Sequence, residues 1–190
     1  GVWDRIEHFQ CFSPTAPQRA ARARIAAMMQ PIHLFDDWRP AERLWGAERT
    51  PRTYACRTLI DAGVPVCFGS DAPVASVNPF WCIHAATART DLAGDPAGGW
   101  QPQERVTVES ALRAYCSEPA RVAGDEAWRG RLAPGCAADF VVLNRDPWQP
   151  DLDWRTVEAD MTVVDGAVVF DRHGERPHLE LPSTQKICVG

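Results

Sequence analysis

Short apolar runs alternate with polar, helix-like segments through the first half of the chain. Runs of the length and character of buried strands lie at residues 2–6, 25–29 and 64–68. The signal for a helix start, a capping side chain followed by proline, recurs as Ser13-Pro14, Thr50-Pro51 and Asn78-Pro79. Alternating strands and helices predict a parallel sheet whose strands are joined by helical crossovers.

The segments between these signals differ in character. Residues 34–49 are polar and aromatic, and they are predicted to form a long connection before the next helix. Gly63 is expected to end that helix in the left-handed conformation, which costs glycine no side-chain clash. Residues 92–103 are rich in Gly, Pro and Asp and indicate a surface loop. Two short helices are expected after it, one capped by Thr107 and one ending at Gly124.

The pattern changes from helices to strands in the last third of the chain. Residues 130–135 are predicted to form a turn-rich entry to a strand at 139–143. Residues 161–170 predict a hairpin, because an Asp-Gly pair separates two apolar runs. The expected organisation is a β/α portion at 1–125, returning β strands at 126–172 and a loose tail at 173–190.

Charge and cysteine usage argue against several classes of protein. The formal net charge of −5 disfavours broad contact with nucleic acid or an anionic membrane. No apolar run approaches the ~20 residues that span a bilayer, and the first residues lack the features of a signal peptide. The seven cysteines include no C-x-x-C pair, so they are interpreted as small buried hydrophobes in a reducing compartment. We therefore expect a cytoplasmic protein with neither nucleic-acid nor membrane partners.

Groups that can bind a metal follow each of the three apolar runs: His8, His33 and Asp71. In barrels of alternating strands and helices, active sites lie at the carboxyl ends of the strands. Imidazole and carboxylate suit a zinc-type ion. Taken singly, His8 is also typical of a packed or surface histidine, His33 of a capping or substrate contact, and Asp71 of a turn. Their recurrence at strand ends favours a site, and no serine-hydrolase, P-loop or dinucleotide-binding motif accompanies it.

Four motifs, in this order, resemble the amidohydrolase superfamily and specifically the branch similar to N-substituted formamide deformylases. They are RIEH at 5–8, MQPIH at 29–33, GVPVCFGSDAP at 63–73 and GRLAPGCAADFVVL at 130–143. The resemblance runs from about Arg5 to Phe170. It implies the C-terminal part, about strands six to eight, of a metal-dependent (β/α)₈ barrel, plus part of a small β-sandwich.

The resemblance also implies roles for individual residues. His8 and Asp71 would bind a divalent metal, zinc in one or two copies, and Asp71 would also be the catalytic proton carrier. His33 and Asp36 would contact a small amide-type substrate. The His-x-His pair and other ligands that such enzymes carry on earlier strands are absent here, and they are expected upstream of Gly1, in a missing N-terminal half of the barrel.

The predicted function is therefore hydrolysis of non-peptide carbon–nitrogen bonds by a metal-activated water in the parent protein. The 190-residue chain alone is expected to be inactive. The alternative is a truncated, non-catalytic fragment or interaction module that lacks the N-terminal metal ligands. A thiol or redox role is a third possibility, against which the unpaired cysteine spacing argues.

Overall fold

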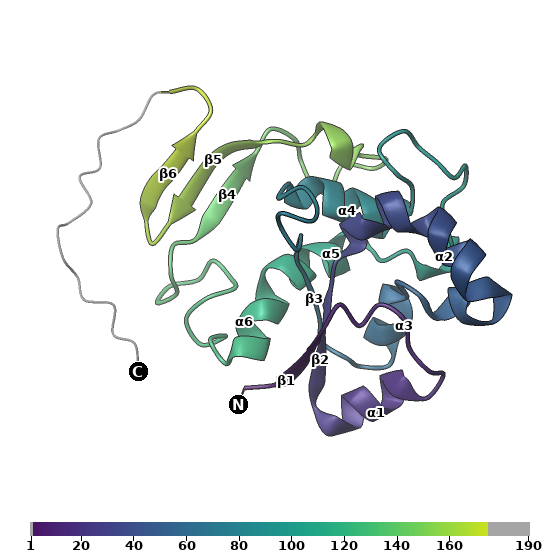
Figure 1. Ribbon diagram of the computed structural model, residues 1–190. Coiled ribbons are helices and arrows are strands. Elements are labelled where there is room, and N and C mark those ends of the chain that lie inside the picture. The colour runs from purple at the N-terminus through teal and green to yellow at the C-terminus, as the bar shows by residue number, and fades with distance from the viewer. Residues whose placement is uncertain (1, 175–190) are drawn as a thin grey trace.

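Three parallel strands form the centre of the computed structural model, which describes residues 2–174 (Figure 1). They lie in chain order, β1 (Asp4–Glu7), β2 (Ile25–Met29) and β3 (Val66–Phe68). Their register places Ile6 beside Ala27, and Ala27 beside Val66. Because both pairs of neighbouring strands are parallel, the three carboxyl ends lie along one edge of the sheet. The predicted α/β class is confirmed.

Helices connect these strands and cover the sheet. Their bounds are α1 (Ala16–Ala23), α2 (Leu34–Arg49), α3 (Cys56–Asp61), α4 (Pro79–Ala88), α5 (Val108–Tyr115) and α6 (Ser117–Ala123), with short 3₁₀ turns η1 (Pro31–His33), η2 (Thr50–Arg52) and η3 (Pro102–Glu104). The capping predictions at Asn78 and Thr107 are confirmed, since their side chains accept hydrogen bonds from the backbone N–H groups of Phe80 (2.9 Å) and Ser110 (3.1 Å). None of the helices within residues 2–174 has the length and apolar character needed to cross a bilayer.

The prediction of a connection at residues 34–49 was wrong, because this segment is helix α2. Pro40 inside the segment and Gly46, which leaves helical geometry at φ 67°, hid the helical pattern. Leu34 and Ala41 are buried in a small cluster with Tyr54 and Trp100. This tertiary packing stabilises a helix that local propensity disfavours.

The first helix also differs from the prediction in its start. It begins at Ala16, with Thr15 at the N-cap and no side-chain capping bond, rather than at Ser13-Pro14. The ends of two later helices are as predicted: Gly63 and Gly124 both adopt left-handed conformations, at φ 79° and φ 82°.

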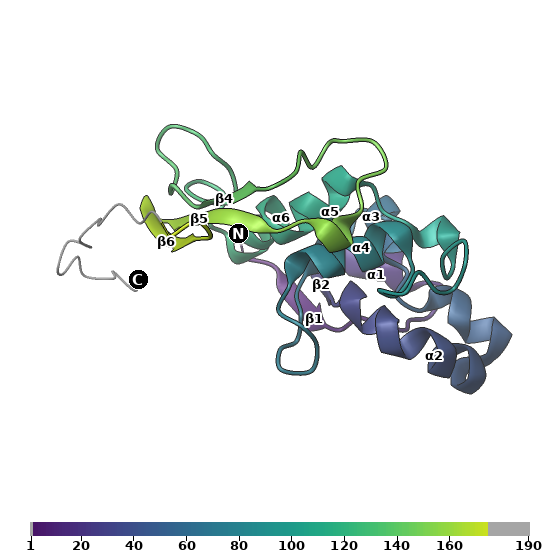
Figure 2. The ribbon, with the colours of Figure 1, turned by 90° about the horizontal axis from the view of Figure 1, so that it is seen from above.

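A second, antiparallel sheet follows the helices. It contains β4 (Phe140–Leu143), β5 (Ala159–Val164) and β6 (Ala167–Asp171) in that order, with the predicted hairpin between β5 and β6. The turn-rich entry predicted at residues 130–135 is confirmed, with Gly130 and Gly135 at positive φ. Figures 1 and 2 show this sheet and α2 at opposite ends of the molecule. The domain boundary near residue 125 stays a prediction.

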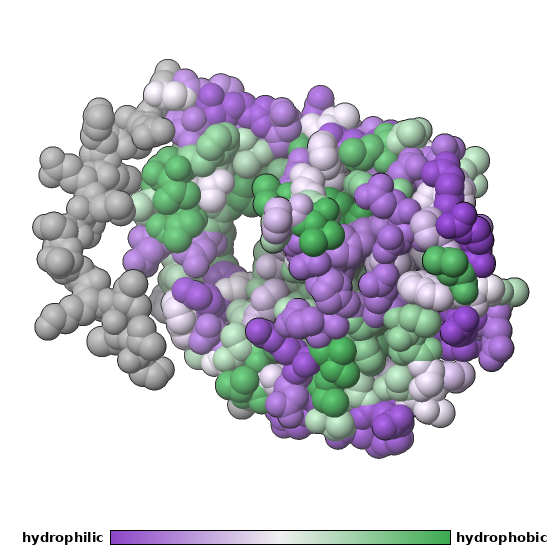
Figure 3. Space-filling view, viewed as in Figure 1, coloured by the Kyte–Doolittle hydropathy of each residue, from purple (hydrophilic) through white to green (hydrophobic). Residues whose placement is uncertain are grey.

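The two sheets differ in how far they are buried. β2 and β3 are largely enclosed by helices, whereas all four residues of β1 are exposed. The antiparallel sheet exposes large apolar side chains, among them Val142, Val169 and Phe170. Figure 3 shows apolar surface gathered over this sheet, at the left of the view. One further turn, η4 (Trp154–Thr156), brings Trp154 and Val157 into the core of the parallel-sheet portion.

Candidate metal centre

Three donor groups converge at the carboxyl edge of the parallel sheet. His8 follows β1, His33 closes the turn after β2, and Asp71 follows β3. Asp71 Oδ2 lies 3.7 Å from His8 Nε2 and 3.9 Å from His33 Nε2. One donor atom from each of the three residues lies within 4.8 Å of the others. Residues far apart in the sequence thus form a compact cluster, in which the imidazole rings of His8 and His33 are 6.0 Å apart.

The backbone at two of these positions adopts an uncommon conformation. His8 and Asp71 have φ values of 68° and 57°, in the left-handed region that non-glycine residues seldom occupy. Such a conformation costs roughly 1–2 kcal/mol per residue. Strained backbone of this kind is frequent at functional sites, where the surrounding structure holds it in place. The turns after β1 and β3 therefore adopt a backbone conformation that the local preferences of His8 and Asp71 do not explain.

The cluster combines one enclosed group with two accessible ones. The His33 side chain is 11% exposed, against 44% for His8 and 37% for Asp71. The buried Nε2 atom of His33 has no hydrogen-bond partner among residues 2–174, and leaving such an atom unpaired costs about 1–3 kcal/mol. A single ion with bonds of about 2.1 Å spans donors up to roughly 4.2 Å apart, and Asp71 Oδ2 lies within that reach of both imidazoles. The three donors together lie within 4.8 Å of one another, so each imidazole fits one divalent cation together with Asp71.

Asp36, expected at the substrate, lies outside this donor cluster. It lines an open pocket of about 440 Å³ together with Ile32 and Pro73. Ile32 directly precedes His33, and Pro73 lies two positions after Asp71. The connections that follow β2 and β3 therefore contribute residues both to the pocket and to the donor cluster.

The sequence did not reveal a polar network beside the cluster. The Tyr54 hydroxyl donates to the Asp37 carboxylate, and Gln10 Nε2 donates to the same carboxylate at 3.1 Å. Burial, followed by the bond to Asp37, raises the pKa of Tyr54, so the phenol remains a donor at neutral pH. Gln10 lies two positions after His8, and this network therefore fixes the connection that leaves β1. No local signal could have joined residues so distant in the chain.

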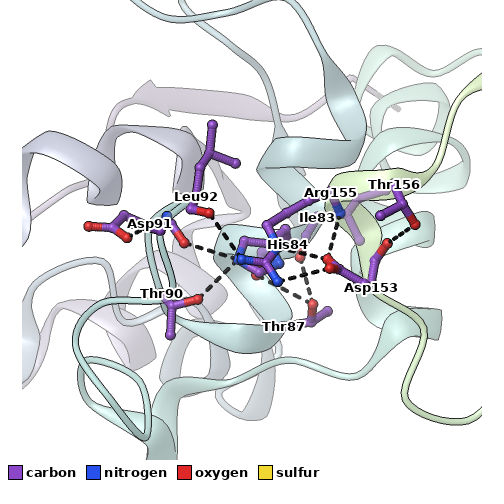
Figure 4. Close-up of polar contacts among 10 residues, drawn as sticks. Ile83, His84, Thr87, Thr90, Asp91, Leu92, Asp153, Arg155 and Thr156 are labelled. Atoms are coloured by element: carbon purple, nitrogen blue, oxygen red, sulfur yellow. Dashed lines mark hydrogen bonds and ion pairs between the residues drawn. The ribbon is translucent and has the colours of Figure 1, made fainter.

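Among the described residues, neither His84 nor His173 belongs to the donor cluster. His84 in α4 is buried, with Nε2 3.0 Å from Thr90 Oγ1 and 3.3 Å from the Asp91 carbonyl oxygen (Figure 4). Burial lowers its pKa. His173 is exposed, and His178 lies outside the described residues.

The cysteines agree only in part with their prediction as buried hydrophobes. Cys56, Cys67 and Cys82 are buried, and burial raises the pKa of their thiols to about 12, 12 and 11. These thiols are therefore protonated at neutral pH and poorly nucleophilic. Cys11 and Cys116 are exposed, contrary to the prediction.

Parallel strands in chain order, with a donor group after each, define a β/α protein of the kind that carries its chemistry at the carboxyl ends of its strands. The sequence model of the amidohydrolase family matches residues 1–170, and the chain belongs to that family.

Individual relatives agree with this assignment. The chain is 37% identical over 145 residues to protein LONG AFTER FAR-RED 3 of Arabidopsis thaliana, a match that covers 76% of this chain and 24% of the relative. It is 31% identical over 173 residues to the N-substituted formamide deformylase of Arthrobacter pascens, covering 90% of this chain and 31% of the relative. The resemblance to that branch is confirmed. The chain spans about a quarter to a third of the length of these relatives.

A solved structure supports the fold. An uncharacterized metal-dependent hydrolase from Pyrococcus horikoshii superposes with a TM-score of 0.66 at 27% identity, covering 75% of this chain and 29% of that protein. Three quarters of the chain thus has the arrangement of a segment of that protein.

Proposed function

We propose that this chain supplies part of the centre of a metal-dependent hydrolase that cleaves carbon–nitrogen bonds in small amide-type substrates. The observation that carries the proposal is the convergence of His8, His33 and Asp71 at one edge of the parallel sheet. Membership of the amidohydrolase family and similarity to a formamide deformylase support the bond type. In this proposal the parallel strands are about the sixth to eighth of a (β/α)₈ barrel, and the antiparallel sheet is part of a small β-sandwich.

His8 and Asp71 are the proposed ligands of the cation, with zinc as the ion that their donor set suits. When bound, such a cation lowers the pKa of a coordinated water toward ~7 and so supplies a nucleophile at neutral pH. His33 is proposed to contact the substrate, and its enclosed Nε2 also lies close enough to Asp71 to act as a further donor. Its low exposure holds the ring in place, so either contact would be made by a fixed imidazole.

Asp71 has the position required for proton transfer. Its side chain is partly exposed, and its Oδ2 lies 3.7 Å from His8 Nε2 and 3.9 Å from His33 Nε2. We assign the Asp71 carboxylate the acceptance of the proton from the attacking water and its delivery to the departing nitrogen. Asp36 is proposed to contact the substrate from the adjoining pocket.

A second candidate is a chain that binds metal weakly or not at all and has no turnover alone. Two observations favour it: the chain spans 24% and 31% of two relatives, and β1 is exposed along its whole length. In this case the donors of other strands, carried by the N-terminal half of the barrel, would be needed for catalysis. Three protein ligands are usual for catalytic zinc.

Metal binding tests the proposed centre directly. Isothermal titration of the 190-residue chain with zinc should give one site, and His8→Ala or Asp71→Asn should weaken it at least tenfold. His173→Ala, at an exposed histidine, is the matched control and should bind as the parent chain does. Unchanged zinc affinity in both site variants would exclude the proposed centre. The same titration separates the two candidates, because only the first predicts a zinc site on this chain that the site variants weaken, whereas the second predicts weak binding or none.

A further inference from the structure

Seven of the nine described residues that line the open pocket beside the candidate metal centre have apolar side chains. Its volume of about 440 Å³ lies in the range of small-molecule sites. Phe35, Trp81 and Leu92 contribute large apolar side chains to it. Among its described lining residues, Asp36 carries the only formal charge. These large side chains can therefore contact an apolar group, while the Asp36 carboxylate disfavours an anionic one.

One wall of this pocket is held from two separate elements. The segment Thr90–Leu92 is contacted from α4 by His84 Nε2, 3.0 Å from Thr90 Oγ1 and 3.3 Å from the Asp91 carbonyl oxygen. Arg155 Nη1 donates to the Leu92 carbonyl oxygen at 3.0 Å. Figure 4 shows both sets of contacts converging on these three residues. Arg155 lies in η4, 63 positions further along the chain, so this contact depends on the tertiary fold.

Arg155 is itself held firmly. Asp153 accepts from Arg155 Nε and from Arg155 Nη2, each at 2.8 Å, in a two-bond pairing of guanidinium with carboxylate. The bond to Arg155 also lowers the pKa of Asp153. Between the two, Trp154 is buried and stacks on Phe80 of α4, with ring centroids 6.4 Å apart. The guanidinium that reaches Leu92 is thus held by a two-bond ion pair at the surface, on a turn that Trp154 anchors in the core.

We propose that Leu92 determines specificity in this pocket and that Arg155 is the positioning residue that holds Leu92 there. The inference rests on the proposed hydrolase function, because the pocket shares its walls with the connections that carry His33 and Asp71. The group received is an apolar substituent of an amide-type substrate. The segment just before β5 thereby shapes a site that is otherwise built from the β/α portion.

Binding of two probes to the 190-residue chain tests the role of Leu92 without any need for turnover. N-butylformamide and N-methylformamide differ only in the length of the apolar substituent, and the parent chain should prefer the butyl compound by at least about tenfold. Nuclear magnetic resonance titration should shift the Leu92 amide and the Trp81 indole signals. Leu92→Ala should reduce the butyl-to-methyl preference severalfold and leave the affinity for the methyl probe unchanged.

Arg155→Ala should reduce the same preference, because Leu92 loses its anchor. Arg155→Lys should restore part of it, since lysine can donate to one carbonyl oxygen but cannot make the two-bond pairing. Arg113→Ala removes a comparable exposed pair, with Glu109 on α5, and should leave the preference as it is. In the full-length enzyme, Leu92→Ala should raise KM for the butyl substrate more than it lowers kcat.

The outcomes separate this inference from the function on which it rests. An unchanged probe preference in Leu92→Ala overturns the role of Leu92, even if zinc binds as proposed. A Leu92 effect without an Arg155 effect overturns the positioning role alone. Loss of zinc binding with the probe preference intact would overturn the proposed metal centre and leave the pocket assignment standing.

Discussion

The Asp71 carboxylate is the group in the cluster that can both bind a cation and carry a proton. Asp71→Asn keeps the size of the side chain and removes its charge and its basicity. In the complete hydrolase that we propose, we expect kcat to fall by about 10²–10⁴, the usual effect of removing a positioned acid–base group. Steady-state kinetics at saturating metal would measure it, so that weaker metal binding does not contribute.

Asp61→Asn is the control for this change, because Asp61 makes an exposed pair with Arg57 on the surface of α3. Its rate should match that of the unmodified enzyme. A near-normal kcat in Asp71→Asn would remove Asp71 from the proton transfer, whatever its part in holding metal.

His84 gives a pH dependence of stability whose sign follows from its burial. Burial lowers its pKa below the ordinary value of 6.5, while nearby Asp91 and Asp153 oppose the shift and Arg155 adds to it. Below about pH 6.5 the unfolded chain therefore binds a proton at His84 that the folded chain does not bind. The free energy of unfolding consequently falls as the pH falls. The loss from this residue is at most about 1.4 kcal/mol per pH unit.

Urea unfolding at several values between pH 5 and pH 7.5 would measure this loss. His84→Gln keeps a side-chain N–H donor and has no titrating ring, so its stability should vary less with pH. His173→Gln changes an exposed histidine and should retain the slope of the parent chain. Equal slopes in the parent chain and His84→Gln would contradict the assignment.

Elements whose ends carry a local chemical signal could be predicted from the sequence. The strand at Ile25–Met29 and the capped start at Asn78 are such cases, because an apolar run or a capping side chain acts over a few residues. The candidate donors at the strand ends could be predicted for the same reason. Helix α2 could not, since its Pro40 and Gly46 contradict the packing that stabilises it.

Contacts that join distant elements were beyond sequence reasoning. The network of Tyr54 with Asp37 and the bond from Arg155 to Leu92 each depend on where whole elements pack. Asp36 could be named from the resemblance, but the pocket that it lines is formed by residues that only the fold brings together. Sequence patterns thus identified the candidate donor groups, but they did not predict the contacts that support them.

The turn η4 provides a test of how the antiparallel sheet is fixed to the rest of the chain. Trp154 is 3% exposed and packs on α4, so Trp154→Ala should lower the free energy of unfolding by about 3–5 kcal/mol. Trp148→Ala removes the same side chain from a position that is 63% exposed, and should change stability by less than about 0.5 kcal/mol. Similar losses in both variants, measured by chemical denaturation, would show that η4 is not an anchor.

A cation held by His8, His33 and Asp71 would link three successive strand–helix units of the parallel sheet. The unfolded chain does not hold these donors together, so zinc should bind the folded state preferentially and raise its stability. At a free zinc concentration 100 times Kd the gain is about 2.7 kcal/mol, which calorimetry should detect as a higher Tm that a chelator reverses. The double variant His8→Ala with Asp71→Asn should lose this gain. If zinc raised its Tm equally, the ion would be binding elsewhere, and alkylation of the exposed thiols of Cys11 and Cys116 would show whether they hold it.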